Sequence, residues 1–213
     1  MAKKYQKEQD SNNEFRPERP APFPKEWRDD IREAVNIMNR GGVILYPTDT
    51  IWGIGCDATN EEAVKRVYAI KQRIDSKALI TLVDSDIKVE FYVRDVPEVA
   101  WDLIECANKP LTIIYDNARN LAPNLLAEDG SVGIRVTNET FSRELCMRMK
   151  RAIVSTSANI SGTPSPKNFS DISEEIKQAV DYICTSRREE SKNPPASSII
   201  KLGAGAEITI IRE

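Results

Sequence analysis

The sequence predicts a single α/β domain built around a mixed β-sheet, and three observations support this prediction. The chain has 213 residues, 40% of them hydrophobic, which is enough for one core and short of two typical domains. Helical and strand patterns alternate along most of the chain, and three short strand patterns cluster near its end, which favours antiparallel pairing there. No internal repeat or interior linker divides the sequence.

Residues 1–24 are expected to form a disordered or loosely packed arm, and residues 25–213 the domain. The arm is polar and contains four prolines in its last eight residues. Because its positive and negative residues nearly balance, it is a poor candidate for an RNA-binding tail.

Residues 26–42 are expected to form the first helix, because apolar residues recur with helical spacing and a glycine pair follows them. Residues 43–48 read as a buried strand that Pro47 breaks. The second helix is expected to open with a capping box, Thr59-x-x-Glu62, and to run to about Gln72. The remaining strands are expected at 78–84, 111–116, 132–138, 152–158, 182–186, 197–202 and 208–213. The remaining helices are expected at 96–109, 139–150 and 171–180.

Several classes of function are excluded by composition. The formal net charge of −3 provides no global basic field for nucleic acid, although a local basic patch could still contact RNA. No apolar run is long enough to span a bilayer, and no apolar signal segment precedes the domain, so we expect a cytoplasmic protein. The chain has no histidine, which removes Ser-His-Asp and Cys-His chemistry, and its four scattered cysteines form no zinc motif.

A nucleotide, if one binds, must be held by side chains. The sequence contains no P-loop, and the glycines of residues 203–207 precede a strand, not a helix. Lys71, Arg73 and Lys77 gather where a helix meets the next strand, and a triphosphate would satisfy their charges. The alternative is that these cations only complement the dipole at the end of the helix.

Polar side chains inside or beside apolar strands are the other candidates. Arg135 lies within an apolar strand and needs an anion, for which an internal salt bridge is the alternative. Thr48 follows a buried strand in what could be only a turn, and Thr112 begins another strand. Ser155, Ser157 and Asn159 end the strand of residues 152–158, where hydroxyl and amide groups would fix a ligand without adding charge.

Five blocks in this order resemble the YrdC-type family, the L-threonylcarbamoyladenylate synthases. They are YPTDTIWGIG at 46–55, KQR at 71–73, KPLT at 109–112, VGIRV at 132–136 and VSTSANISG at 154–162. The last two strand segments, SSIIKL and ITIIRE, resemble the closing blocks of the family. The resemblance covers about residues 27–213.

The resemblance implies a twisted, open α/β sheet with flanking helices and a concave, positively lined cavity. It implies that L-threonine, bicarbonate and ATP, with Mg²⁺ bound to the ATP, give L-threonylcarbamoyladenylate and pyrophosphate. The product would serve a tRNA-modifying transferase complex that modifies an adenosine beside the anticodon. A weak contact with tRNA or double-stranded RNA would be compatible with this role.

The resemblance also implies the roles of individual residues. The residues implied to neutralise phosphates during catalysis are Lys71, Arg73 and Arg135. The residues implied to contact threonine or the nucleotide are Thr48, Lys77, Thr112, Ser155, Ser157, Asn159, Ser165, Ser197 and Arg212. The chain departs from the family pattern at Lys77, at Leu82, where a histidine is common, and at Asn108-Lys109.

Two other functions compete with the synthase. A non-catalytic tRNA or double-stranded RNA binder could use the same concave face, although aromatic residues make up only 7% of the chain and stacking platforms would need more. A carbamoyl-transferring domain of hydrogenase-maturation proteins is the other relative, but those proteins carry zinc-finger-like cysteine motifs that are absent from this sequence.

Overall fold

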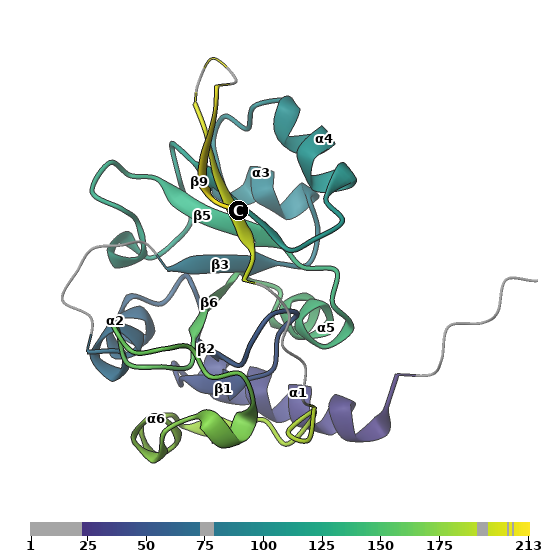
Figure 1. The fold of residues 1–213 in the computed structure, drawn as a ribbon, viewed down its shortest axis with the longest axis vertical. Coiled ribbons are helices and arrows are strands. Elements are labelled where there is room, and N and C mark those ends of the chain that lie inside the picture. The colour runs from purple at the N-terminus through teal and green to yellow at the C-terminus, as the bar shows by residue number, and fades with distance from the viewer. Residues whose placement is uncertain (1–22, 73–78, 191–195, 204, 206) are drawn as a thin grey trace, which may run out of the picture.

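A computed structural model describes residues 23–72, 79–190, 196–203, 205 and 207–213 (Figure 1). The predicted fold class is confirmed, because the described strands form one nine-stranded mixed sheet. The strands are β1 (Ile44–Tyr46), β2 (Gly53–Gly55), β3 (Ile80–Val83), β4 (Leu111–Tyr115), β5 (Val132–Val136), β6 (Ile153–Ser157), β7 (Tyr182–Ile183), β8 (Ser198–Leu202) and β9 (Ile208–Arg212). Their spatial order is β7-β1-β2-β6-β3-β5-β4-β8-β9.

The sheet combines both kinds of pairing. β3 pairs with β5, β4 with β8 and β1 with β7 in parallel, and the other neighbours are antiparallel. The antiparallel pair of β8 and β9 confirms the expectation for the end of the chain. The sheet turns progressively from β1 to β9, so that β9 runs across β3 and β5 in the view of Figure 1.

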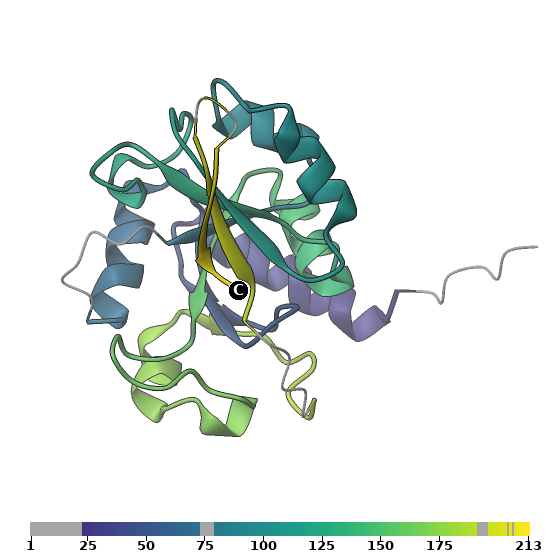
Figure 2. The ribbon, with the colours of Figure 1, turned by 45° about the horizontal axis from the view of Figure 1, so that its top comes forward.

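Six α-helices and two 3₁₀ turns flank the described sheet. The helices are α1 (Lys25–Asn39), α2 (Glu61–Ile70), α3 (Ile87–Tyr92), α4 (Val99–Cys106), α5 (Thr140–Met149) and α6 (Glu174–Ala179), and the 3₁₀ turns are η1 (Pro123–Leu125) and η2 (Phe169–Asp171). α1 packs against α5 and reaches β1 and β7. α4 and α6 lie at opposite ends of the molecule (Figures 1 and 2). None of the described helices is long and apolar enough to cross a bilayer.

The predicted start of the second helix is one residue off. Asn60, not Thr59, caps α2, because its side chain accepts a hydrogen bond from the backbone N–H of Ala63 at 3.1 Å. The Thr59 hydroxyl instead donates to Asp57 at 2.7 Å. Asn and Thr both serve as N-caps, so the sequence alone does not choose between these neighbours.

One strand, β2, and one α-helix, α3, were not predicted from the sequence. β2 lies in the segment that we expected to be only a turn, and it fits between β1 and β6 because Gly55 has no side chain. A Cβ at this position would lie 2.7 Å from Tyr46 Cε1 and 2.8 Å from the carbonyl oxygen of Val154. α3 has only six residues, and it buries Val89 and Tyr92 but leaves Ile87 and Phe91 exposed, so its apolar residues do not mark one buried face in the sequence.

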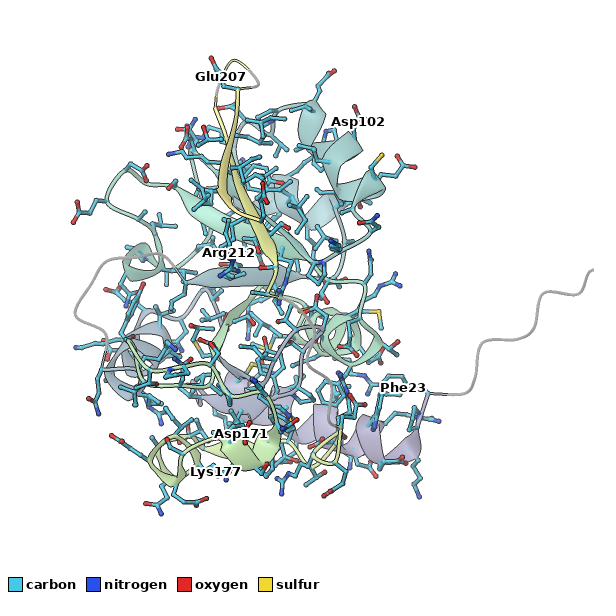
Figure 3. The ribbon with its side chains drawn as sticks, in the orientation of Figure 1. Phe23, Asp102, Asp171, Lys177, Glu207 and Arg212 are labelled. Carbon is cyan, nitrogen blue, oxygen red and sulfur yellow. The ribbon has the colours of Figure 1, made fainter. Side chains whose placement is uncertain are left out.

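The expected arm falls mostly outside the described residues, and only Phe23 and Pro24 can be placed. Phe23 contacts Trp27 edge to face, with ring centroids 5.7 Å apart, and Trp27 makes a similar contact with Phe141. Phe23 therefore packs on the domain at the start of α1, far from β9 (Figure 3).

Candidate active site

One cavity of about 470 Å³ gathers most of the predicted site residues. Its walls come from the loop after β1, the starts of β2 and β3, the end of β6, residues 165–167 and the two C-terminal strands. The predicted residues among its lining are Thr48, Arg135, Ser155, Ser157, Ser165, Ser197 and Arg212. A smaller hollow of about 220 Å³, bordered by α4 and β4, contains none of them. We therefore assign the candidate active site to the larger cavity.

Among the described residues that line this cavity, the charged side chains are all positive: Arg135, Lys167 and Arg212. Hydroxyl groups and apolar side chains make up most of the remaining wall. An anion would find hydrogen-bond donors there and no carboxylate among the lining residues.

The sequence left two alternatives for Arg135, an internal salt bridge and a bound anion, and the structure is compatible with both. It lies on β5 and is only 3% exposed, and its Nη2 atom lies 3.1 Å from Oδ1 of Asp49. This contact has the distance of an ion pair but not hydrogen-bond geometry, and the buried Nε atom of Arg135 also has no hydrogen-bond partner. An unsatisfied buried guanidinium nitrogen is costly, and an anion in the cavity could satisfy it.

Arg212 approaches the cavity from β9, the last strand at one edge of the sheet, and lies near the centre of the view in Figure 3. Its Nε and Nη2 atoms donate to the carbonyl oxygen of Ser197 at 2.9 and 2.7 Å. Burial, and then the positive charge of Arg135, lower the pKa of Arg212. The two guanidinium groups are therefore near enough to repel each other, and a polyanion between them would relieve this repulsion.

Thr112 stands behind the wall and does not line the cavity. Its hydroxyl lies 3.2 Å from the hydroxyl of Ser197, and both side chains are buried. β4 and β8 are parallel neighbours, which brings these two residues together. Thr112 can thus orient Ser197, while Ser197 and Arg212 face the cavity.

β6 supplies the hydroxyl-rich wall. Ser155 and Ser157 line the cavity, and Ser157 is paired across the sheet with Gly53 of β2. A Cβ at Gly53 would lie 3.3 Å from the carbonyl oxygen of Thr156 and 3.5 Å from Oγ of Ser155. The glycine therefore leaves room for the strand and its hydroxyls to reach the cavity.

Lys71 does not reach into the cavity as the resemblance implied. It is 3% exposed, and its ammonium donates to the carbonyl oxygens of Ser157 and Asn159 at 2.6 and 2.8 Å. The side chain thus leaves the end of α2 and holds the segment that follows β6. These contacts place Lys71 to position the end of β6 and the turn after it, and a contact between Lys71 and a phosphate stays a prediction.

Asn159 is not among the described residues that line the cavity. Its Nδ2 atom donates to the carbonyl oxygens of Ile160 and Thr163 at 3.0 and 2.7 Å, which stabilises the turn after β6. Its Oδ1 atom is buried and has no hydrogen-bond partner. A ligand contact by Asn159 stays a prediction.

Two predicted residues, Arg73 and Lys77, lie outside the described residues. Lys167 was missed, although it lines the cavity beside Ser165. Asp171 accepts hydrogen bonds from the backbone N–H groups of Lys167 and Asn168 at 3.1 Å, which fixes this turn. A single lysine in an irregular segment gives no periodicity or spacing signal, so the sequence could not have identified it.

Comparisons with known proteins identify the family. The profile of the Sua5/YciO/YrdC family, described as "Telomere recombination", matches residues 36–213. A threonylcarbamoyl-AMP synthase of Stutzerimonas stutzeri is 30% identical over 179 residues, which cover 84% of this chain and 95% of that protein. The synthase of Pseudoalteromonas translucida is 32% identical over 155 residues, which cover 71% of this chain and 83% of that protein.

Two solved structures share the fold of this chain. P. abyssi Sua5 in complex with L-threonine superposes with a TM-score of 0.77 at 26% identity, over 89% of this chain. The chain spans only 55% of that protein. E. coli YciO shares the fold, with a TM-score of 0.77 at 23% identity over 90% of this chain and 91% of its own. The profile match and the curated relatives together show that the chain belongs to the Sua5/YciO/YrdC family.

Proposed function

We propose that the protein is a threonylcarbamoyl-AMP synthase, which joins L-threonine, bicarbonate and ATP into L-threonylcarbamoyladenylate and pyrophosphate. The observation that carries this proposal is the cavity itself, where the guanidinium groups of Arg135 and Arg212 meet the serines of β6. The curated synthases that this chain matches over nearly their whole length support the same reaction.

The chemistry needs no imidazole base. The amine of threonine attacks the carbon of bicarbonate, and loss of water leaves a carbamate. A carbamate oxygen then attacks the α-phosphorus of ATP, and the bond to the β-phosphate oxygen breaks as pyrophosphate leaves. The substrates supply both nucleophiles, so the protein mainly positions them and stabilises the growing negative charge.

The described walls of the cavity would bind phosphate groups and orient the substrates. Arg135 and Arg212 would bind phosphate oxygens, and Arg73 and Lys77, outside the described residues, would add to them. The hydroxyls of Thr48, Ser155, Ser157, Ser165 and Ser197 would orient threonine and the nucleotide. Lys71 and Thr112 would act from behind the wall.

Mg²⁺ would enter with ATP. In the described part of the chain, no group of three or more Asp, Glu, Cys or His side chains could hold a metal ion, and none of the described residues that line the cavity carries a carboxylate. The ion would therefore be held by phosphate oxygens and water, which suits its preference for oxygen ligands and retained waters.

The product would pass to a tRNA-modifying transferase complex in the cytoplasm. A mixed carbamic–phosphoric anhydride is reactive, so an acceptor that uses it promptly is expected. Direct contact with tRNA or double-stranded RNA would be weak. The catalytic proposal is preferred to a purely RNA-binding role because the named relatives are synthases.

The decisive experiment measures pyrophosphate released from ATP by the purified protein. Release should require both threonine and bicarbonate, and serine in place of threonine should support less of it. Mass spectrometry should detect threonylcarbamoyladenylate. Pyrophosphate release without threonine, or RNA binding with no turnover, would overturn the proposal.

A further inference from the structure

The loop that joins β1 to β2 forms one wall of the candidate active site and is held from outside. Thr48, Thr50 and Trp52 line the cavity from this loop, and Asp49 reaches Arg135. Inside the loop, the Thr48 hydroxyl donates to the carbonyl oxygen of Ile51 at 2.7 Å and accepts from the N–H of Thr50 at 3.1 Å. These contacts shape the loop but do not attach it to the rest of the molecule.

Arg187 provides such an attachment. Its Nη2 atom donates to the carbonyl oxygen of Thr48 at 3.3 Å, and its Nη1 atom donates to Oε1 of Glu139 at 3.0 Å. Nη2 also lies 2.9 Å from a carboxylate oxygen of Glu190. Only 9% of the Arg187 side chain is exposed, so water screens these contacts weakly.

The partners of Arg187 are themselves fixed. Glu139 is the N-cap of α5, and its carboxylate accepts from the N–H groups of Phe141 and Ser142 at 3.0 and 2.8 Å. The hydroxyl of Ser142 lies 3.5 Å from the carbonyl oxygen of Pro47. Ser142 at the start of α5 and the guanidinium of Arg187 therefore contact adjacent carbonyl oxygens of the same loop, those of Pro47 and Thr48.

The backbone of Arg187 is anchored on the other side by α1. Asp30, which is 3% exposed, accepts from the N–H groups of Thr185 and Ser186 at 3.0 and 2.7 Å. It also accepts from the hydroxyl of Tyr182 at 2.7 Å. Arg187 itself has φ of 63°, a left-handed conformation that is unfavourable for a residue with a side chain. Its neighbours must therefore hold it in place.

We propose that Arg187 is a positioning residue of the synthase, which fixes the loop of residues 47–52 against the start of α5. It touches no cavity surface of the main site and acts through the carbonyl of Thr48. Without it, the loop would be free to shift, and Thr48, Trp52 and the Asp49 partner of Arg135 would shift with it. This role rests on the proposed function, but the placement of the loop is testable without turnover.

The neighbouring Arg188 offers a matched control. It belongs to the same segment, and its guanidinium donates to the carbonyl oxygens of Cys184 and Ile183 at 2.8 and 2.9 Å and stacks on Phe169. Among the described residues, its hydrogen bonds do not reach the loop of residues 47–52, and its route to that loop is indirect, through Phe169, whose ring centroid lies 4.8 Å from that of Trp52. Replacing it should therefore disturb the segment without releasing the loop.

The first test compares Arg187→Met with Arg188→Met in the pyrophosphate-release assay. Loss of the charge-assisted contacts should lower kcat/KM about ten- to a hundredfold in Arg187→Met, whereas Arg188→Met should stay within about threefold of wild type. Both variants are expected to melt earlier, so the assay is run well below either melting temperature. Equal kinetic losses in the two variants would overturn the proposal.

Arg187→Lys covers the case in which Arg187→Met does not fold. A lysine keeps the charge between Glu139 and Glu190 but lacks the planar fork that also reaches Thr48. We expect a melting temperature near that of wild type with kcat/KM still reduced several-fold. Full activity in a folded Arg187→Lys protein would contradict the positioning role.

A double-mutant cycle separates positioning from general stability. Asp49→Asn weakens the loop's link to Arg135, so adding Arg187→Met should then cost less in kcat/KM than it does alone. A merely structural role would give additive kinetic losses.

Hydrogen exchange of the loop peptide, residues 47–53, should be faster in Arg187→Met and unchanged in Arg188→Met. This readout needs no turnover: unchanged exchange in Arg187→Met would refute the positioning role, whatever the reaction proves to be. If exchange changes as expected but wild-type protein releases no pyrophosphate, the proposed function fails and the loop assignment stands.

Discussion

Arg135 shows how a structural ion pair is compatible with a proposed ligand-binding role in the same side chain. The ion pair with Asp49 stabilises its charge within an apolar strand, and its Nε atom has no hydrogen-bond acceptor. The ion pair therefore orients the guanidinium toward the cavity without using all of its donors. Sequence reasoning found the residue but could not find its partner, because Asp49 lies far away in the chain.

Arg135→Met should raise the KM for ATP and lower kcat/KM about ten- to a hundredfold, the usual effect of losing a charge-assisted contact. Asp49→Asn removes only the partner and should change the KM for ATP much less. Steady-state pyrophosphate release at varied ATP decides between them. Equal increases in KM would mean that the pair acts as one structural unit.

Asn159 gives a second prediction at this scale. Asn159→Asp should lower the melting temperature more than Asn159→Ala, because a carboxylate cannot donate to Ile160 and Thr163 and would face their carbonyl oxygens. Each lost hydrogen bond is worth about 1 kcal/mol.

ATP titration of both Asn159 variants, well below their melting temperatures, tests the remaining ligand role. If Asn159 only stabilises the turn, both variants should bind ATP within a few-fold of wild type. A large loss in Asn159→Ala would show that the buried Oδ1 atom serves the nucleotide.

Three of the predicted residues that line the cavity share a property. Ser155, Ser157 and Arg135 sit on regular strands, where alternation tells which side chains share a face. The contacts of Lys71 were not foreseen, because its partners are carbonyl oxygens of a segment that is distant in sequence. No local pattern could reveal them.

Among the elements, α2 is linked by an ion pair to Asp181, which is distant from it in the sequence. Arg66 of α2 lies 2.8 and 3.0 Å from the two oxygens of Asp181, and Asp181 also accepts from the N–H of Val43 at 2.7 Å. The hydrogen bond from Arg66 lowers the pKa of Asp181, with a smaller contribution from Val43. The carboxylate therefore links α2 to the starts of β1 and β7.

This pKa shift predicts a pH-dependent loss of stability. Since the pKa of Asp181 is lower in the folded protein, its stabilisation is present above the ordinary value of about 3.9 and is lost as the pH falls through the folded value. The difference in melting temperature between wild type and Asp181→Asn should be largest near pH 7 and shrink below about pH 4. Asp29→Asn, in an exposed pair with Arg32, should show almost no difference at either pH.

Elements with clear periodicity were predictable, and short ones were not. The strands that became β3, β4, β5 and β6 were expected from apolar runs of typical strand length. β2 has three residues, and two of them are glycines. It fits in the sheet because these glycines have no side chains that would collide with the neighbouring strands. Such an element is dictated by tertiary packing.

For the whole molecule, the boundary between arm and domain is the remaining sequence prediction. Deleting residues 1–22 should leave the melting temperature and the activity nearly unchanged, because the deleted sequence is polar and rich in proline. Deleting residues 1–24 also removes Phe23 from Trp27, and should lower the melting temperature by roughly 2–4 °C for each kcal/mol lost.

Phe23→Ala in the full chain is the control for this pair of deletions. It should reproduce the loss seen on deleting residues 1–24. If the shorter deletion lowers the melting temperature as much as the longer one, residues 1–22 pack on the domain and the predicted boundary is wrong.

The placement of β6 between β2 and β3 has a consequence for how the protein acquires its activity. Both neighbours come from much earlier in the chain, and Arg212 comes from much later, so a fragment must span residues 48–212 to contain all the described lining residues of the cavity. Pairings of this kind close long loops and form slowly. Nucleotide binding should therefore appear only when the entire chain has folded, and ATP at a hundred times its Kd should stabilise the native state by about 2.7 kcal/mol. The substrate would then protect the newly made enzyme from proteolysis.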